Sequence, residues 1–182
     1  TLEESLSVYN DLVHQGKINY IGLSNFAAWQ YMKAVGITRQ HNYAPIACIQ
    51  PMYNLVKRQA EVELFELATE ERLGVFTYGP LGGGLLSGKY GVVRRPDAGR
   101  LVENSLYKTR YSESGYFEVA ERFTKLAERV GHSPSALAIA WVARHPSVTA
   151  PLIGGRTAEH TKTALEAVNI DMTDELYGEI AA

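Results

Sequence analysis

Residues 74–90 read GVFTYGPLGGGLLSGKY, a short apolar run followed by a glycine-rich turn. From Gly83 the letters run G-x-x-x-x-G-K, which is the phosphate-binding P-loop pattern except at Tyr90, where that motif needs a Ser or Thr hydroxyl for Mg²⁺. Pro96 and Gly99 also break the helix that would have to begin at the lysine. The P-loop is therefore rejected. Two interpretations of the turn remain open, a flexible loop and a turn whose backbone approaches a ligand closely.

Three further apolar runs resemble 74–77 and lack clean alternation of apolar and polar residues, as strands buried on both faces do. These runs cover 20–23, 46–49 and 148–153. Helical periodicity is found in the segments between and after the runs, at 26–35, 60–72, 115–130, 134–144 and 158–168. The repeated strand and helix order predicts a parallel α/β fold, either doubly wound or a barrel.

Capping signals support this division of the chain. Thr1 with Glu4 predicts a capping box for a first helix, and Ser133 before Pro134 predicts a helix start. Thr173, followed by two acidic residues, predicts the start of a last short helix.

The number of strand and helix units is small for a complete barrel. A (β/α)₈ barrel typically has about 250 residues and eight units, whereas this chain of 182 residues has four strands. Four parallel strands with helices on one face would leave the strand edges and the other face open to water. The chain is therefore expected to form one domain that is not stable by itself.

Composition limits the classes of partner and compartment. The chain is 46% hydrophobic and 21% charged with a net charge of −2, which is typical of soluble globular protein and gives no reason to bind nucleic acid or an anionic membrane. No membrane-spanning run or signal-peptide pattern occurs. The single cysteine, Cys48, is expected to be a buried small hydrophobe and favours a reducing, cytoplasmic location. The histidines lack metal-ligand spacing, so no metal is predicted.

Polar residues follow each apolar run, and the carboxyl ends of parallel strands meet at one edge of a sheet. Ser24, Asn25 and Gln50 offer hydroxyl and amide groups suited to a neutral, planar, amide-bearing ligand. Tyr78 offers a flat face for stacking. Each residue alone has an ordinary role, as a helix cap, a loop contact or a core side chain, and it is the set that indicates a ligand site.

The last strand end predicts an anion site. Arg156 and Thr157 precede the helix at 158–168, whose first N–H groups and dipole favour a phosphate. The stretch 89–110 contains six basic and two acidic residues. It is interpreted either as a clamp for a pyrophosphate or as a solvated loop.

Four segments resemble the aldo-keto reductases: GKINYIGLSNF at 16–26, QPMYNL at 50–55, YGPLGGGLLSGKY at 78–90 and IGGRT at 153–157. They occur in the family's order over nearly the whole chain. The resemblance implies a parallel (β/α)₈ TIM barrel, of which residues 1–182 supply strands five to eight as the C-terminal half of one domain. The N-terminal half of the barrel is then a missing partner.

The resemblance also implies a site for NADPH or NADP. Residues matching Ser24, Asn25 and Gln50 hold the nicotinamide carboxamide, and the residue matching Tyr78 stacks on the ring. The implied pyrophosphate site and its surroundings comprise Gly79, Pro80, Leu81, Gly82, Gly83, Ser87 and Lys89, with Arg100 closing over it. The remaining implied cofactor residues are Ile153, Gly154 and Gly155, then Arg156 and Thr157 around the 2′-phosphate, and His160 near the adenine. At His160 the family often has Gln, and Thr163-Ala164 replaces its Glu-Asn.

Enzymes of this family reduce a small aldehyde or ketone to an alcohol with a Tyr, Lys, Asp and His tetrad from the first half of the barrel. No catalytic residue is therefore predicted in this chain, which is expected to be inactive alone. Tyr53 and Lys57, four residues apart, form a weak substitute pair, and Tyr53 is expected to pack near the cofactor. Two alternatives are a non-enzymatic cofactor-binding subunit resembling potassium-channel β subunits, and a half-barrel that forms a homo-oligomer through its open edges.

Overall fold

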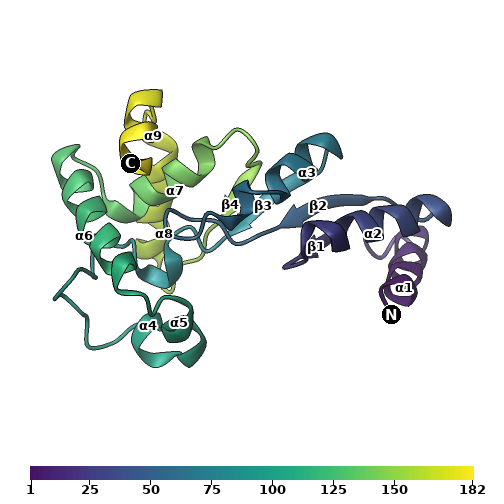
Figure 1. Cartoon of the computed structure of the whole chain (residues 1–182), viewed down its shortest axis with the longest axis horizontal. Helices are drawn as coiled ribbons and strands as arrows, with labels where there is room; N and C mark the ends of the chain where they lie inside the picture. Colours follow the sequence, from purple (N-terminus) through teal and green to yellow (C-terminus); the bar gives the residue numbers. More distant parts are fainter.

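Four parallel strands form one sheet in the computed structural model, which describes residues 1–182 (Figure 1). The strands are β1 (Ile21–Ser24), β2 (Ile46–Gln50), β3 (Gly74–Tyr78) and β4 (Ala150–Leu152). Their order in the sheet is β1-β2-β3-β4, so strands adjacent in sequence are adjacent in space. A doubly wound sheet reverses its strand order at a switch point. This order never reverses, so the doubly wound alternative is wrong for this chain.

Helices occupy the predicted positions, with shifted ends. They are α1 (Leu2–His14), α2 (Ala28–Gln40), α3 (Leu64–Glu70), α6 (Ser114–Arg129), α7 (Pro134–Arg144), α8 (Ala158–Leu165) and α9 (Asp174–Ala181). The predicted capping box at Thr1 is confirmed, and Pro134 occupies the first turn of α7. Two short helices, α4 (Arg100–Glu103) and α5 (Ser105–Arg110), lie in the stretch 89–110. Three 3₁₀ turns, η1 (Gln59–Glu61), η2 (Gly82–Gly84) and η3 (Glu166–Asn169), complete the elements.

The two faces of the sheet differ in burial. Ile21, Ile49 and Val75 are buried, whereas Gly22 is exposed and Cys48 is only partly buried. Gly22 and Cys48 lie on the same face, because a Cβ at Gly22 would be 2.5 Å from the Cys48 Sγ. The expectations of strands buried on both faces and of a buried Cys48 are therefore wrong, since the rest of this chain covers one face more completely than the other.

Register explains how β2 keeps its apolar residues on the covered face. Ile21 pairs with Ile46 and Gly22 pairs with Cys48, so β2 contains one extra residue, Ala47. Such a bulge shifts the alternation of side chains by one position. Ile46 and Ile49 are consequently both buried although they are three residues apart.

Aromatic contacts in the core join α7 to its neighbours. The Trp141 ring stacks on Tyr53 at 5.5 Å and on Tyr177 of α9 at 5.4 Å between centroids. Tyr53 also meets Phe65 of α3 edge-to-face at 4.9 Å. Such pairs each contribute about 0.5–1.5 kcal/mol beyond the area they bury. Tyr53 is fully buried in this cluster, so its ring contacts protein side chains.

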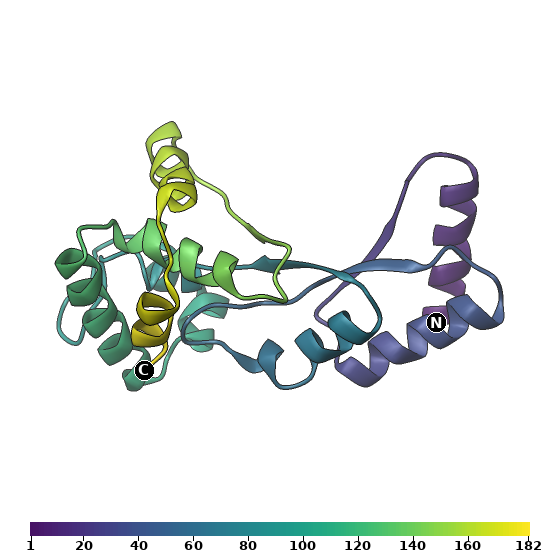
Figure 2. The ribbon, with the colours of Figure 1, turned by 90° about the horizontal axis from the view of Figure 1, so that it is seen from above.

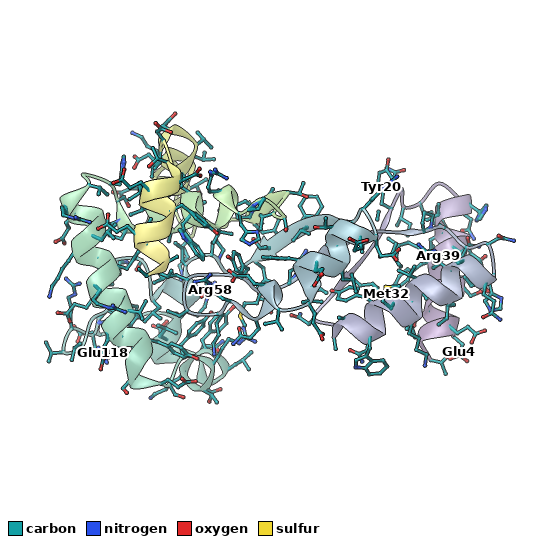
Figure 3. All side chains as sticks on the ribbon, turned by 45° about the horizontal axis from the view of Figure 1, so that its top comes forward. Glu4, Tyr20, Met32, Arg39, Arg58 and Glu118 are labelled. Atoms are coloured by element: carbon teal, nitrogen blue, oxygen red, sulfur yellow. The ribbon has the colours of Figure 1, made fainter.

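The molecule is elongated, with α1 and α2 at one end and α6, α7 and α9 at the other (Figure 2). Tyr20, just before β1, is 81% exposed and points away from the ribbon (Figure 3). A hollow of about 530 Å³ lies between α1 and the free edge of β1, lined by residues that include Leu6, Gly22 and Ser24.

No helix combines the length and apolarity needed to cross a membrane, and no three His, Cys, Asp or Glu side chains gather as metal ligands.

Candidate functional site

A chain of hydrogen bonds joins the carboxyl ends of three strands. The Ser24 hydroxyl donates to the Gln50 carbonyl at 2.9 Å, and the Asn25 amide donates to the Ser24 Oγ at 3.1 Å. The Tyr78 hydroxyl donates to the Asn25 Oδ1 at 2.7 Å. The structure therefore brings together all four residues predicted to face a planar, amide-bearing ligand.

Backbone geometry places these groups. Ser24 pairs with Gln50 in the sheet register, so the two strand ends are level. Asn25 has a left-handed φ of 60°, which Asn tolerates better than most residues. The side-chain amide of Gln50 makes no hydrogen bond within the chain. It is the backbone carbonyl of Gln50 that accepts the Ser24 hydroxyl. None of the four residues is charged, so the group suits a neutral polar ligand.

The glycine-rich turn follows Tyr78 directly and adopts left-handed backbone conformations. Gly79 and Gly83 both have a φ of 69°, which disfavours other residues. A Cβ at Gly79 would meet no atom within 4 Å, whereas a Cβ at Gly83 would lie 2.6 Å from the Tyr107 ring. The Gly82 N–H donates to the Gly79 carbonyl at 2.9 Å. The backbone at Gly79 thus borders open space, and no helix follows Lys89, as the rejection of a P-loop predicted.

Two basic side chains lie near Tyr107, the residue that a Cβ at Gly83 would contact. The guanidinium groups of Arg100 and Arg110 lie 5.0 and 5.3 Å from the Tyr107 ring centroid. Arg95, in contrast, donates to the Gly91 carbonyl and lies 3.7 Å from the Phe117 ring, so it fastens its own loop. The stretch 89–110 is therefore partly a folded helical pair and not simply a solvated loop.

The segment after β4 lies in solvent. All of 153–160 is exposed, and the Thr157 hydroxyl accepts the His160 N–H at 3.2 Å as the N-cap of α8. The Arg156 guanidinium lies 3.9 Å from the Glu103 carboxylate of α4, and both are largely exposed. This contact brings 153–157 to the helices beyond the glycine-rich turn. No hydrogen bond or ion pair joins 153–160 directly to Ser24, Asn25 or Tyr78.

Two buried residues beside the turn were missed as site residues. Asn54 is fully buried, and its amide donates to the Gly79 carbonyl at 2.9 Å and to the Tyr111 hydroxyl at 3.2 Å. Burial raises the pKa of Tyr111 above its ordinary value. The sequence marks Asn54 only as part of the motif QPMYNL, because its partners are 25 and 57 residues away.

Comparison with known proteins identifies the family. The model of the aldo/keto reductase family matches residues 1–182. The chain belongs to the aldo/keto reductase family.

Two relatives illustrate the match of this aldo/keto reductase chain. An uncharacterized oxidoreductase, YrpG, from Bacillus subtilis is 33% identical over 174 residues, which are 96% of this chain and 51% of YrpG. Protein tas from Escherichia coli is 32% identical over 184 residues, which cover 100% of this chain and 52% of the relative. The chain thus spans about half the length of these relatives. The resemblance inferred from the four motifs is confirmed.

The substitute catalytic pair is not formed. Lys57 Nζ donates to the Tyr116 hydroxyl at 2.8 Å, and the Tyr53 hydroxyl donates to Glu61 instead. Burial, together with the hydrogen bond to Glu61, raises the pKa of Tyr53 far above its ordinary value. Tyr53 is therefore held protonated, without the neighbouring lysine that would make it an acid. Arg58, which binds Glu61 at 2.9 Å, lies 5.6 Å from the Trp141 ring.

Proposed function

We propose that this aldo/keto reductase chain carries most of the cofactor site of an NADPH-dependent oxidoreductase that reduces aldehydes or ketones to alcohols. The observation that carries the proposal is the hydrogen-bonded group Ser24, Asn25 and Tyr78 at the carboxyl edge of the sheet, immediately before the left-handed turn at Gly79. Family membership over residues 1–182 supports the reaction class.

The donor set fits a nicotinamide dinucleotide in two parts. Ser24, Asn25 and the free side-chain amide of Gln50 suit the carboxamide, and the Tyr78 ring offers a stacking face for the nicotinamide. The turn beginning at Gly79 has open space beside its backbone, as close approach of phosphates requires. When bound, the cofactor supplies a hydride to the carbonyl carbon. This chain's residues bind and orient it, and none is proposed to deliver the proton.

Cations are proposed for the phosphates. Lys89 and Arg100 both follow the glycine-rich turn in sequence, and Arg156 lies near the end of the segment 153–157. The Glu103 carboxylate 3.9 Å from Arg156 opposes a 2′-phosphate there, but the two side chains are 72% and 55% exposed, so their attraction is weak. Arg156 is therefore free to exchange Glu103 for a phosphate, which carries more charge and more acceptors.

We further propose that the four strands are strands five to eight of a (β/α)₈ barrel. The unreversed parallel order, the less covered face at Gly22 and Cys48, and the hollow beside the free edge of β1 support the proposal. The complementary strands would cover that face and pair with β1 and β4, and they would also bring the catalytic tetrad.

The test is a direct assay of the full-length protein with NADPH and benzaldehyde, followed at the absorbance of the reduced nicotinamide. Oxidation of NADPH that depends on the aldehyde supports the reductase. Cofactor binding without turnover on a panel of aldehydes and ketones would instead favour a non-enzymatic cofactor-binding subunit. Absence of NADPH binding in a folded protein would refute the proposed site.

A further inference from the structure

Asn54 is a fully buried polar side chain with every hydrogen-bonding group of its amide in use. Its Nδ2 donates to the Gly79 carbonyl at 2.9 Å and to the Tyr111 hydroxyl at 3.2 Å. Its Oδ1 accepts the Val56 N–H at 3.1 Å. A buried amide is expensive unless its groups are paired, so this degree of pairing fixes the orientation of the side chain.

The two partners of the Asn54 amide contact opposite ends of one turn. Gly79 begins the turn directly after Tyr78, and its carbonyl also accepts the Gly82 N–H at 2.9 Å. Tyr111 is buried beneath Gly82, where a Cβ would lie 3.5 Å from the Tyr111 ring. Asn54 therefore holds the first residue of the turn directly and its fourth residue through Tyr111.

The backbone around Asn54 is itself anchored. Asn54 and Lys57 exchange two backbone hydrogen bonds, at 3.2 and 3.0 Å. The Lys57 ammonium donates to the Tyr116 hydroxyl at 2.8 Å and lies 4.6 Å from the centre of that ring. Tyr116 is on α6 and Asn54 follows β2, so the loop that carries Asn54 is attached to β2 by the chain and to α6 by the Lys57 contact.

We propose that Asn54 is a positioning residue that, with Tyr111, holds the turn 79–82 in the shape that receives the phosphates of the dinucleotide. The inference rests on the proposed function of that turn. Removing the amide leaves the Gly79 carbonyl with one partner fewer and the Tyr111 hydroxyl without its donor. The Tyr111 hydroxyl is buried, so losing its donor costs free energy, and the turn is then held less firmly in this one conformation.

The first test needs no cofactor and measures hydrogen exchange at the Gly82 amide. Asn54→Ala is expected to speed this exchange about tenfold relative to the amides of β2, because one buried hydrogen-bonded anchor is lost. Tyr111→Phe keeps the ring against Gly82 and is expected to speed it about threefold. Tyr53→Phe removes a buried tyrosine hydroxyl outside the site. This variant should leave the Gly82 ratio, which is the exchange rate at Gly82 divided by that of the β2 amides, unchanged. An unchanged Gly82 ratio in both Asn54→Ala and Tyr111→Phe would overturn the proposal.

The second test compares two ligands of the full-length protein by calorimetry. Asn54→Ala is expected to weaken NADPH about tenfold and adenosine 2′-phosphate less than twofold, since the latter lacks the nicotinamide half and both bridging phosphates. Equal losses for both ligands would show a general structural defect and overturn the positioning role. A folded wild-type protein that binds neither ligand would refute the proposed function instead, and the Gly82 exchange would still decide whether Asn54 holds the turn.

Discussion

The Tyr78 hydroxyl donates a 2.7 Å hydrogen bond to Oδ1 of Asn25, joining the ends of β3 and β1 across the end of β2. The bond holds the phenol ring by its hydroxyl, at the edge of the ring, and leaves both faces of the ring available for other contacts. Asn25 is held in turn by Ser24, so the ring is part of a prearranged polar group. A binding site that is ordered before its ligand arrives loses less conformational entropy on binding.

Two substitutions at Tyr78 can therefore separate the contribution of its ring to cofactor binding from that of its hydroxyl. Tyr78→Phe keeps the stacking face and is expected to change the NADPH dissociation constant less than threefold, whereas Tyr78→Ala removes the face and should raise it about tenfold. Fluorescence titration of the reduced nicotinamide measures both constants. Equal weakening in the two variants would show that the hydroxyl, and not stacking, is what matters.

Local patterns predicted the strands and the longer helices. The apolar runs predicted the first three strands to within about a residue at each end, and the caps at Thr1 and Thr173 were in place, whereas Ser133 precedes α7 without a capping hydrogen bond. The helices α4 and α5 were not predicted because four and six residues are too few to show a helical period.

Non-local relationships were not accessible from local patterns. The strand order, which excludes a doubly wound sheet, depends on pairing between distant segments. The role of Asn54 depends on Gly79 and Tyr111, and the partial exposure of Cys48 depends on which face of the sheet the helices cover. The grouping of residues 24–25, 50 and 78 could be predicted because parallel strands end at one edge, a rule that needs only the strand boundaries.

Arg156 is expected to distinguish NADPH from NADH. Arg156→Ala removes the proposed partner of the 2′-phosphate and should raise the NADPH dissociation constant about tenfold to a hundredfold, as the loss of a charge-assisted hydrogen bond does. The NADH constant should change less than twofold. Arg144→Ala, which removes an exposed arginine paired with Asp174 away from the site, is the matched control. Equal weakening of both cofactors by Arg156→Ala would remove the 2′-phosphate assignment.

A Gly→Ala substitution is expected to change the free energy of unfolding in opposite directions at Gly83 and at Gly36. Gly83 has a φ of 69°, and a Cβ there would lie 2.6 Å from the Tyr107 ring. Gly83→Ala should therefore lower the free energy of unfolding by about 1–3 kcal/mol. Gly36 is inside α2, where a Cβ would meet no atom within 4 Å, so Gly36→Ala should raise it by about 0.5–1 kcal/mol. Urea unfolding measures both, and a stabilising Gly83→Ala would contradict the left-handed turn.

His145 makes the stability of the chain depend on pH. Its ring is 4.6 Å from Phe65 and 5.5 Å from Tyr53 between centroids, and the Ser147 N–H donates to its Nδ1 at 3.2 Å, which requires that nitrogen to be unprotonated. Burial lowers the pKa of His145 below its ordinary 6.5, with Glu61 opposing this shift and Arg58 adding to it. The folded state therefore binds fewer protons than the unfolded state at mildly acidic pH.

The free energy of unfolding should consequently fall as the pH is lowered through the ordinary pKa of histidine, about 6.5, because protons then favour the unfolded chain. Urea unfolding at pH 7.5 and pH 5.5 measures the loss, which should be smaller in His145→Gln because the variant has no proton to bind at this position. His160→Gln removes an exposed histidine of α8 and should keep the wild-type loss. If His145→Gln loses as much stability as the wild type between the two pH values, another group is responsible for the acid sensitivity.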